Sequence, residues 1–284
     1  MRLKGLAKAL VAVAALAGSL APSAAAQPVG DVVVFGDSFA ANPDQQRHWA
    51  AKIPGMASSD YLANYPKMGG CLQGPDNWPR QLAYRTGRDV RDWSCSGATS
   101  WSVMSRINGA IRAGDLNPGT RAVVLAVGIN DYWPDNMFTA NTRFDQPRIQ
   151  NNYVANMHAA AARVREVAPN ARIIIPGMLA ISEPWGAQRV CLINVVPNLP
   201  GGVPVPIVQR VETLTRDNQI RAAREIGAVY LDLKPLSAGH NTCARDNERW
   251  VAGFIDTTTR DYNMAYHPAR AGSAFVAGEV ARVL

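Results

Sequence analysis

The stretch VVVFGDSF, from Val32 to Phe39, decides the fold class of this 284-residue chain. Its apolar first half is rich in β-branched side chains, which is typical of a buried strand, and a Gly-Asp-Ser turn follows at once. Ser38 is therefore expected at the carboxyl end of a strand, where open α/β sheets place their functional sites. A serine hydroxyl is a weak nucleophile without a neighbouring base, so this string alone fits an ordinary turn serine equally well.

Short apolar runs alternate with longer segments of helical periodicity along the rest of the chain. The expected strands are 31–35, 89–93, 122–127, 172–176 and 229–233, and the expected helices are 78–86, 101–112, 148–167, 207–226 and 269–284. This alternation predicts a three-layer α/β sandwich, in which helices cover both faces of a five-stranded parallel sheet. The connections 40–77, 129–147, 178–206 and 234–266 are predicted as long loops, which in a compact domain are usually functional or disordered.

The first 26 residues have the composition of an export signal. Basic residues precede an apolar run from Leu10 to Leu16, and Ala24 to Ala26 supply the small residues of a cleavage site. The run is shorter than the roughly 20 residues that span a bilayer. We expect residues 1–26 to be removed and residues 27–284 to form a single domain outside the cytoplasmic membrane, secreted or held in the cell envelope.

The charge of the chain argues against nucleic acid as a partner. Its net charge of +7 includes three basic residues of the export signal, which leaves about 7 − 3 = +4. Nucleic-acid binding needs a basic stripe with reading or stacking elements, and the arginines here are scattered. No later segment is apolar enough to predict a membrane span.

Two polar blocks follow the second and third expected strands. They are CSGAT (Cys95 to Thr99) and GIND (Gly128 to Asp131), and a third block, YHP at 266–268, precedes the last expected helix. Acyl transfer develops negative charge on a carbonyl oxygen, so amide donors fixed at strand ends are candidates for binding that oxyanion. Taken singly, Gly97 fits a tight turn and Asn130 fits a cap or turn residue.

These blocks, in this order, resemble those of the GDSL/SGNH hydrolase family. That family has Gly-Asp-Ser near the start, a glycine after the second strand, Gly-x-Asn-Asp after the third, and His-Pro near the end. The resemblance covers essentially the whole chain after the export signal, and the loops and cysteines are similar to those of secreted actinobacterial esterases and phospholipases. It implies a flavodoxin-like SGNH hydrolase fold. It also implies that Ser38 is the nucleophile, that His267 is the general base, and that the Ser38 amide, Gly97 and Asn130 form the oxyanion hole.

One block departs from the family pattern, because Met264 stands where Asp-x-x-His-Pro has its aspartate. The group that orients His267 is therefore open. Asp261 and Asp256 are nearby carboxylates, but both are read more simply as solvated loop residues. The main-chain carbonyl of Met264 or Ala265 could accept the same hydrogen bond, as in some members of the family that the chain resembles. We predict a Ser-His dyad supported by main chain.

Four cysteines in an exported chain favour disulfides over metal ligation, because no Cys-x-x-Cys or Cys/His spacing occurs. Three pairings are possible, and we favour Cys71 with Cys95 and Cys191 with Cys243. The first pair would tie a long loop to the segment that carries Gly97. The histidines do not cluster with carboxylates at metal-ligand spacing, so we predict no metal and no cofactor.

The predicted activity is hydrolysis of carboxylic esters, small-molecule or lipid, through an acyl-enzyme on Ser38 in a monomer. An acyltransferase is an alternative, because an acyl-enzyme does not dictate its acceptor. A non-catalytic wall- or lipid-binding module is a third hypothesis, prompted by the missing aspartate at position 264. Retention of the other site residues argues against this module.

Overall fold

The computed structural model describes residues 31–132 and 145–284. The predicted export signal at 1–26 lies outside the described residues, as does most of the connection 129–147. No helix in the described ranges is long and apolar enough to cross a membrane.

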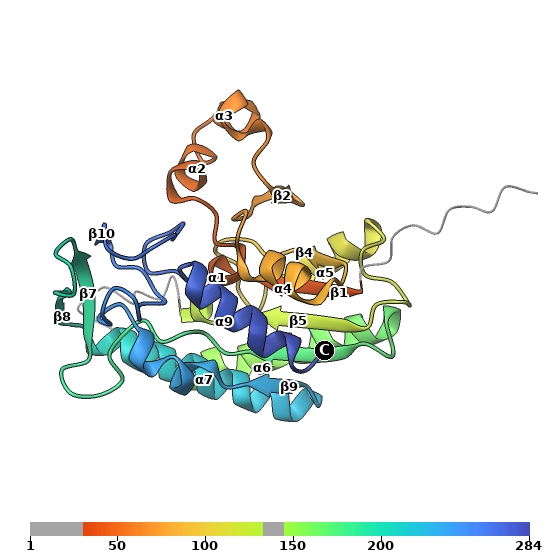
Figure 1. Cartoon of the computed structure of the whole chain (residues 1–284). Helices are drawn as coiled ribbons and strands as arrows, with labels where there is room; N and C mark the ends of the chain where they lie inside the picture. Colours follow the sequence, from red (N-terminus) through yellow and green to blue (C-terminus); the bar gives the residue numbers. More distant parts are fainter. Residues whose placement is uncertain (1–30, 133–144) are drawn as a thin grey trace, which may run out of the picture.

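The centre of the fold is the predicted five-stranded parallel sheet (Figure 1). Its strands are β1 (Val32–Gly36), β4 (Val90–Asp92), β5 (Ala122–Ala126), β6 (Arg172–Pro176) and β9 (Val229–Leu231), in the order β4-β1-β5-β6-β9. Every residue of β1 is buried, because helices cover both faces of the sheet. That burial explains why the strand reads as an uninterrupted apolar run.

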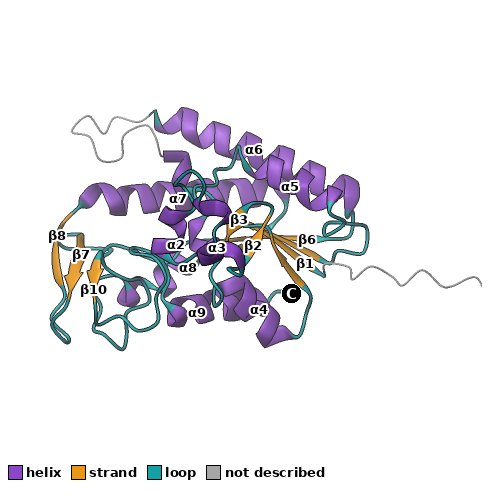
Figure 2. Cartoon of the chain, turned by 90° about the horizontal axis from the view of Figure 1, so that it is seen from above, coloured by secondary structure: helices purple, strands orange, loops and turns teal. Residues whose placement is uncertain are grey.

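Helices form the two outer layers, as predicted (Figure 2). On one face lie α4 (Trp78–Thr86) and α9 (Arg270–Ala281), which pack on Val32 and Val34. On the other lie α5 (Val103–Arg112), α6 (Gln146–Val167) and α7 (Pro206–Ile226), which pack on Val33 and Phe35. Helix α4 has the predicted bounds because local signals fix both ends. Asn77 accepts a hydrogen bond from the Arg80 amide at the start, and Gly87 adopts a left-handed φ of 66° at the end.

Three connections predicted as loops contain regular structure, so that prediction was too coarse. The segment after β1 holds α1 (Ser38–Ala41), α2 (Gln45–Ala50), η1 (Met56–Ser58), α3 (Asp60–Ala63), β2 (Lys67–Met68) and β3 (Cys71–Leu72). Residues 178–206 hold β7 (Arg189–Asn194) and β8 (Gly201–Pro204). The connection 234–266 begins within α8 (Leu233–Leu236) and holds η3 (Ala238–His240) and β10 (Ile255–Asp256). Strands β10, β7 and β8 form a second sheet at one end of the molecule (Figure 1).

Both predicted disulfides are present. Cys71 of β3 bonds Cys95, which follows β4, with their Cα atoms 5.2 Å apart. Cys191 of β7 bonds Cys243, with a Cα separation of 4.9 Å. The first therefore fastens the excursion after α1 to the loop of Gly97, and the second fastens the small sheet to the segment that leads to His267.

Candidate active site

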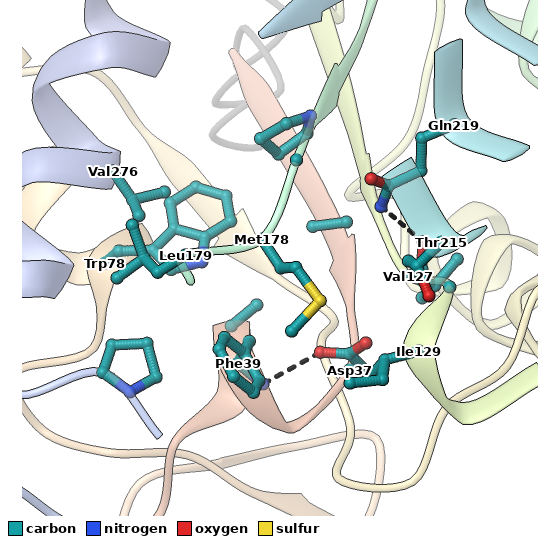
Figure 3. Close-up of a pocket in the computed structure, with 16 residues that line it drawn as sticks. Asp37, Phe39, Trp78, Val127, Ile129, Met178, Leu179, Thr215, Gln219 and Val276 are labelled. Atoms are coloured by element: carbon teal, nitrogen blue, oxygen red, sulfur yellow. Dashed lines mark hydrogen bonds between the residues drawn. The ribbon is translucent and has the colours of Figure 1, made fainter. Parts of the chain in front are cut away.

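The turn that carries Ser38 is held by Asp37. The Asp37 amide donates to the Ala126 carbonyl of β5 at 3.0 Å, and the Asp37 carboxylate accepts the Phe39 amide at 2.9 Å. This second bond caps α1, whose first residue is Ser38. Figure 3 shows it at the edge of a cavity of about 30 Å³ that Met178 and Thr215 also line. Burial, with the nearby Asp131 charge, raises the pKa of Asp37 to about 7.

The three residues predicted to supply the oxyanion donors, Ser38, Gly97 and Asn130, line the same cavity. Within residues 31–132 and 145–284, the main-chain amides of Ser38 and Gly97 have no hydrogen-bond acceptor. Gly97 has a left-handed φ of 82°, which favours glycine, and a Cβ atom there would meet nothing within 4 Å. Asn130, in η2 (Ile129–Tyr132), donates one amide hydrogen to the Ala98 carbonyl at 3.0 Å. This bond fixes the direction of its second amide hydrogen.

Asp131 joins the Asn130 segment to the Gly97 loop. Its carboxylate accepts the Ser100 amide at 3.0 Å and also accepts the Ser100 hydroxyl. Asn156 of α6 donates to the same hydroxyl oxygen at 2.9 Å. Burial raises the pKa of Asp131, and the two bonds from Ser100 oppose that shift. The two donor segments are thereby fixed relative to each other.

The imidazole of His267 is oriented by a main-chain carbonyl. Its Nδ1 lies 2.7 Å from the Ala265 carbonyl oxygen, which can only accept, so Nδ1 carries the proton. Nε2 is then the unprotonated nitrogen; it is buried and has no hydrogen-bond partner in the described part of the chain. Burial lowers the pKa of His267 to about 4; the bond to Ala265 opposes this shift and the charge of His48 adds to it.

The other candidates for orienting His267 do not contact its ring. The Met264 carbonyl accepts the His267 main-chain amide at 3.3 Å. Asp261 is exposed, and its main-chain carbonyl accepts the Arg270 amide at 2.8 Å. The reading of Asp256 as a solvated residue was wrong: it is 7% exposed and accepts hydrogen bonds from Asn194, Gly253 and Thr259. The Asp256 carboxylate therefore holds together the segments of Asn194, Gly253 and Thr259 and does not orient His267.

Sequence reasoning missed two side chains, at the end of α1 and the start of α2, that hold the His267 segment in place. Asn42 donates from Nδ2 to the Pro268 carbonyl at 2.8 Å. Gln45 accepts the Ala265 amide on Oε1 at 2.8 Å, next to the carbonyl that orients the imidazole. These bonds join residues more than 200 positions apart. No motif or spacing in the sequence could have identified them.

A cavity of about 660 Å³ brings together the residues predicted to act. Ser38, Gly97, Asn130 and His267 all line it. Its other walls are largely apolar and include Phe39, Ile181, Val190, Leu192, Val205 and Val208. In the described ranges, no group of three or more His, Cys, Asp or Glu side chains is arranged to hold a metal ion.

Known proteins resemble this chain in sequence and in fold. The model of the GDSL-like Lipase/Acylhydrolase family matches residues 34–275. Lipase 2 of Streptomyces coelicolor is 28% identical over 261 residues, which cover 83% of this chain and 80% of that protein. Among solved structures, phospholipase A1 from Streptomyces albidoflavus has a TM-score of 0.54 at 19% identity, covering 88% of this chain and 98% of that one. The extracellular lipase from Streptomyces rimosus has a TM-score of 0.56 at 18% identity, covering 88% and 99%. The chain therefore belongs to the GDSL-like lipase/acylhydrolase family and is a carboxylic ester hydrolase.

Proposed function

We propose that this hydrolase is a secreted esterase or lipase that cleaves its substrates through an acyl-enzyme on Ser38. One observation carries the proposal: four segments from different parts of the chain place Ser38, Gly97, Asn130 and His267 on one cavity. The nucleophile, the oxyanion donors and the base of an acyl transfer are thereby available to one bound ester.

In the proposed reaction, Nε2 of His267 takes the Ser38 hydroxyl proton as Oγ attacks the ester carbonyl. The oxyanion of the tetrahedral intermediate accepts hydrogen bonds from the Ser38 and Gly97 amides and from Asn130. His267 then gives its proton to the leaving alcohol, and the acyl group stays on Ser38. In the second half of the reaction, His267 takes a proton from a water molecule, which attacks the acyl-enzyme carbonyl. His267 then returns the proton to Ser38 Oγ, and the carboxylic acid is released. Hydrogen bonds between nucleophile and base often tighten only when substrate binds.

The Ala265 carbonyl does part of the work of a triad aspartate. It fixes the ring so that Nε2 is the basic nitrogen, but it supplies a partial charge rather than a full one. The imidazolium that forms during catalysis is therefore less stabilised than in a Ser-His-Asp triad. The low pKa of His267, about 4, agrees with a base that lacks a carboxylate partner.

The apolar cavity walls support an ester with an apolar acyl chain as the substrate, because hydrocarbon is favourably transferred from water to such a surface. The printed names of the relatives, a lipase and a phospholipase A1, support a lipid ester. Two disulfides and an extracellular relative support export, with residues 1–26 as the signal and 27–284 as one domain.

A fluorophosphonate probe tests the nucleophile. The folded protein is expected to take up one probe molecule per chain on Ser38, because only an activated serine attacks the phosphorus. Peptide mapping by mass spectrometry locates the adduct. Ser38→Ala should remain unlabelled, and a Ser96→Ala variant should be labelled at the wild-type rate. Labelling of another serine in the folded protein, with Ser38 unmodified, would refute the proposal.

The pH dependence tests the base. His267 accepts a proton only when neutral, that is, above its pKa of about 4. We expect kcat/KM to fall as the pH drops through about 4, well below the ordinary imidazole value of about 6.5. Initial rates on a short p-nitrophenyl ester, with fluorescence to confirm folding at each pH, give the profile.

The pH profile needs a control for Asp37, because this residue, with its pKa raised to about 7, also titrates within the range of the measurement. Asp37→Asn keeps a carbonyl oxygen for the Phe39 amide and removes the titration. A decline near neutral pH that disappears in this variant belongs to Asp37. A midpoint near 6.5 that persists in Asp37→Asn contradicts the desolvated base.

A further inference from the structure

The sheet β10-β7-β8 carries apolar side chains that face solvent. Seven of them are 45% to 68% exposed: Ile193, Val195, Val196, Leu199 and Val203 on the β7–β8 hairpin, with Phe254 and Ile255 at β10. We call these seven residues the apolar rim. Isolated exposed apolar residues are ordinary on a soluble protein, but a contiguous group commonly marks a surface that binds something.

The rim hairpin is also free of charge. None of the 20 residues from Val190 to Gln209 is charged, in a chain where 18% of residues are. Arg189, just before this stretch, is neutralised by Glu183, with the two charged groups 2.7 Å apart. The Asp246 carboxylate, which accepts the Asn198 amide at 3.0 Å, is likewise paired with Arg249. A hairpin without charged residues of its own suits an electrically neutral, apolar partner, because moving an unpaired charged side chain into hydrocarbon is costly.

The apolar rim continues into the cavity of the proposed active site. Phe254 stacks on Tyr266, with ring centroids 5.9 Å apart and planes inclined by 12°, and Tyr266 lines the cavity. The Phe254 amide donates to the Leu192 carbonyl at 2.9 Å, and the Leu192 side chain lines the same cavity. The apolar rim therefore directly adjoins the cavity that Ser38 lines.

The sheet that carries the apolar rim is fixed by a disulfide and by buried polar contacts. Cys191 of β7 is tied to Cys243, and Asn194 at the end of β7 donates to the buried carboxylate of Asp256 in β10 at 3.0 Å. Arg249, itself buried, lies 3.7 Å from the same carboxylate. These bonds hold the rim side chains outward, because the backbone cannot turn them into the core without breaking buried polar contacts.

We propose that the apolar rim docks this protein onto the surface of a zwitterionic phospholipid layer, from which the neighbouring cavity draws its ester. The inference rests on the proposed function for the fate of the lipid, but the docking itself needs no catalysis. A zwitterionic layer fits this surface because the exposed hairpin has no charged residue from Val190 to Gln209, and because the rim contacts the wall of the largely apolar cavity. The binding is hydrophobic, so it is insensitive to salt, unlike attraction to an anionic surface.

The test uses the Ser38→Ala protein, residues 27–284, with phosphatidylcholine vesicles in a flotation assay. We expect vesicle-bound protein at low salt and at about 0.5 M NaCl, where the Debye length is only a few ångströms. Val196→Asp/Leu199→Asp in this background is expected to lower the partition coefficient at least about tenfold, because each aspartate must be desolvated. Tyr84→Asp on α4 changes a side chain that is 94% exposed, away from the rim, and should bind as Ser38→Ala does.

Activity separates docking from catalysis. With Ser38 intact, the double variant should hydrolyse a short soluble p-nitrophenyl ester within about twofold of wild type. It should lose vesicle phosphatidylcholine hydrolysis in proportion to its binding. The double variant is folded if its melting temperature and its rate of fluorophosphonate labelling are those of wild type. If it is not, the Leu199→Asp single variant replaces it in the same assays.

Three results would overturn the docking proposal. They are failure of the Ser38→Ala protein to float with the vesicles, equal flotation of the double variant, and a dimer in sedimentation that the double variant dissociates. In the last case the rim is an interface between copies of the chain. Flotation without any Ser38 labelling or ester hydrolysis would instead refute the proposed function and leave the docking in place.

Discussion

The His267→Ala variant is expected to lose about 10⁴- to 10⁶-fold in kcat on a short p-nitrophenyl ester, with a much smaller change in KM. Alanine removes Nε2, so nothing accepts the Ser38 proton or returns it to the leaving alcohol. Residual turnover above the buffer rate would come from the oxyanion donors alone. Steady-state kinetics on the folded protein measures the loss.

Asp261→Asn is the matched comparison, because it tests whether a carboxylate supports His267. Asp261 is exposed and lies six residues before the histidine, whereas the Ala265 carbonyl is 2.7 Å from Nδ1. We expect kcat within a few-fold of wild type. A loss of about a thousandfold or more in folded Asp261→Asn would make this aspartate the third member of a triad and exclude main-chain support.

Asp256→Asn is likewise expected to keep kcat within a few-fold of wild type, but it should lower the stability of the fold. The Asp256 carboxylate accepts several buried hydrogen bonds, so the amide replaces at least one acceptor contact with a mismatched donor. A lower melting temperature with kcat retained below the transition is the expected pattern.

The Asn130→Ala variant is expected to lose about 10²- to 10³-fold in kcat, with a smaller change in KM. Asn130 is bonded to the Ala98 carbonyl through one amide hydrogen, so the other is held in place before the oxyanion forms. Such a donor costs no reorganisation in the transition state, which is why its loss falls on kcat.

The relative effects of Asn130→Ala on kcat and on KM identify the role of Asn130. A rise in KM with kcat unchanged would mean that the amide positions substrate and does not stabilise the oxyanion. Thr99→Ser serves as the control, because Thr99 lines the same cavity and serine keeps the hydroxyl that accepts the Ser102 amide. Its kcat should stay within a few-fold of wild type.

The central sheet and its helices could be predicted from sequence because local patterns determine them. Strand β1 is apolar throughout since both its faces are covered, and α4 is delimited by Asn77 and Gly87. Of the three possible disulfide pairings, the favoured one is present, with Cys71 bonded to Cys95 and Cys191 to Cys243. The order of the four motif blocks then placed the candidate residues at one edge of the sheet.

The other parts of the fold and of the candidate site depend on contacts between distant segments, which no local sequence pattern encodes. The β7–β8 hairpin contains several prolines and a Gly-Gly pair, and it lacks the alternation that marks a half-buried strand. The role of Gln45 depends on meeting the Ala265 amide, which lies 220 residues away in sequence. The burial of Asp256 likewise depends on β7, a strand that the sequence did not predict.

The bond from Asn42 to the Pro268 carbonyl spans 226 residues of sequence and has a consequence for when activity appears during biosynthesis. Ser38 is synthesised 267 − 38 = 229 residues before His267. In the folded protein, α9, which follows His267, packs beside α4. A nascent or truncated chain thus holds the proposed nucleophile without its base. The proposed ester hydrolysis therefore requires synthesis of the chain through His267 and Pro268, so that completion of the chain itself acts as an activation step.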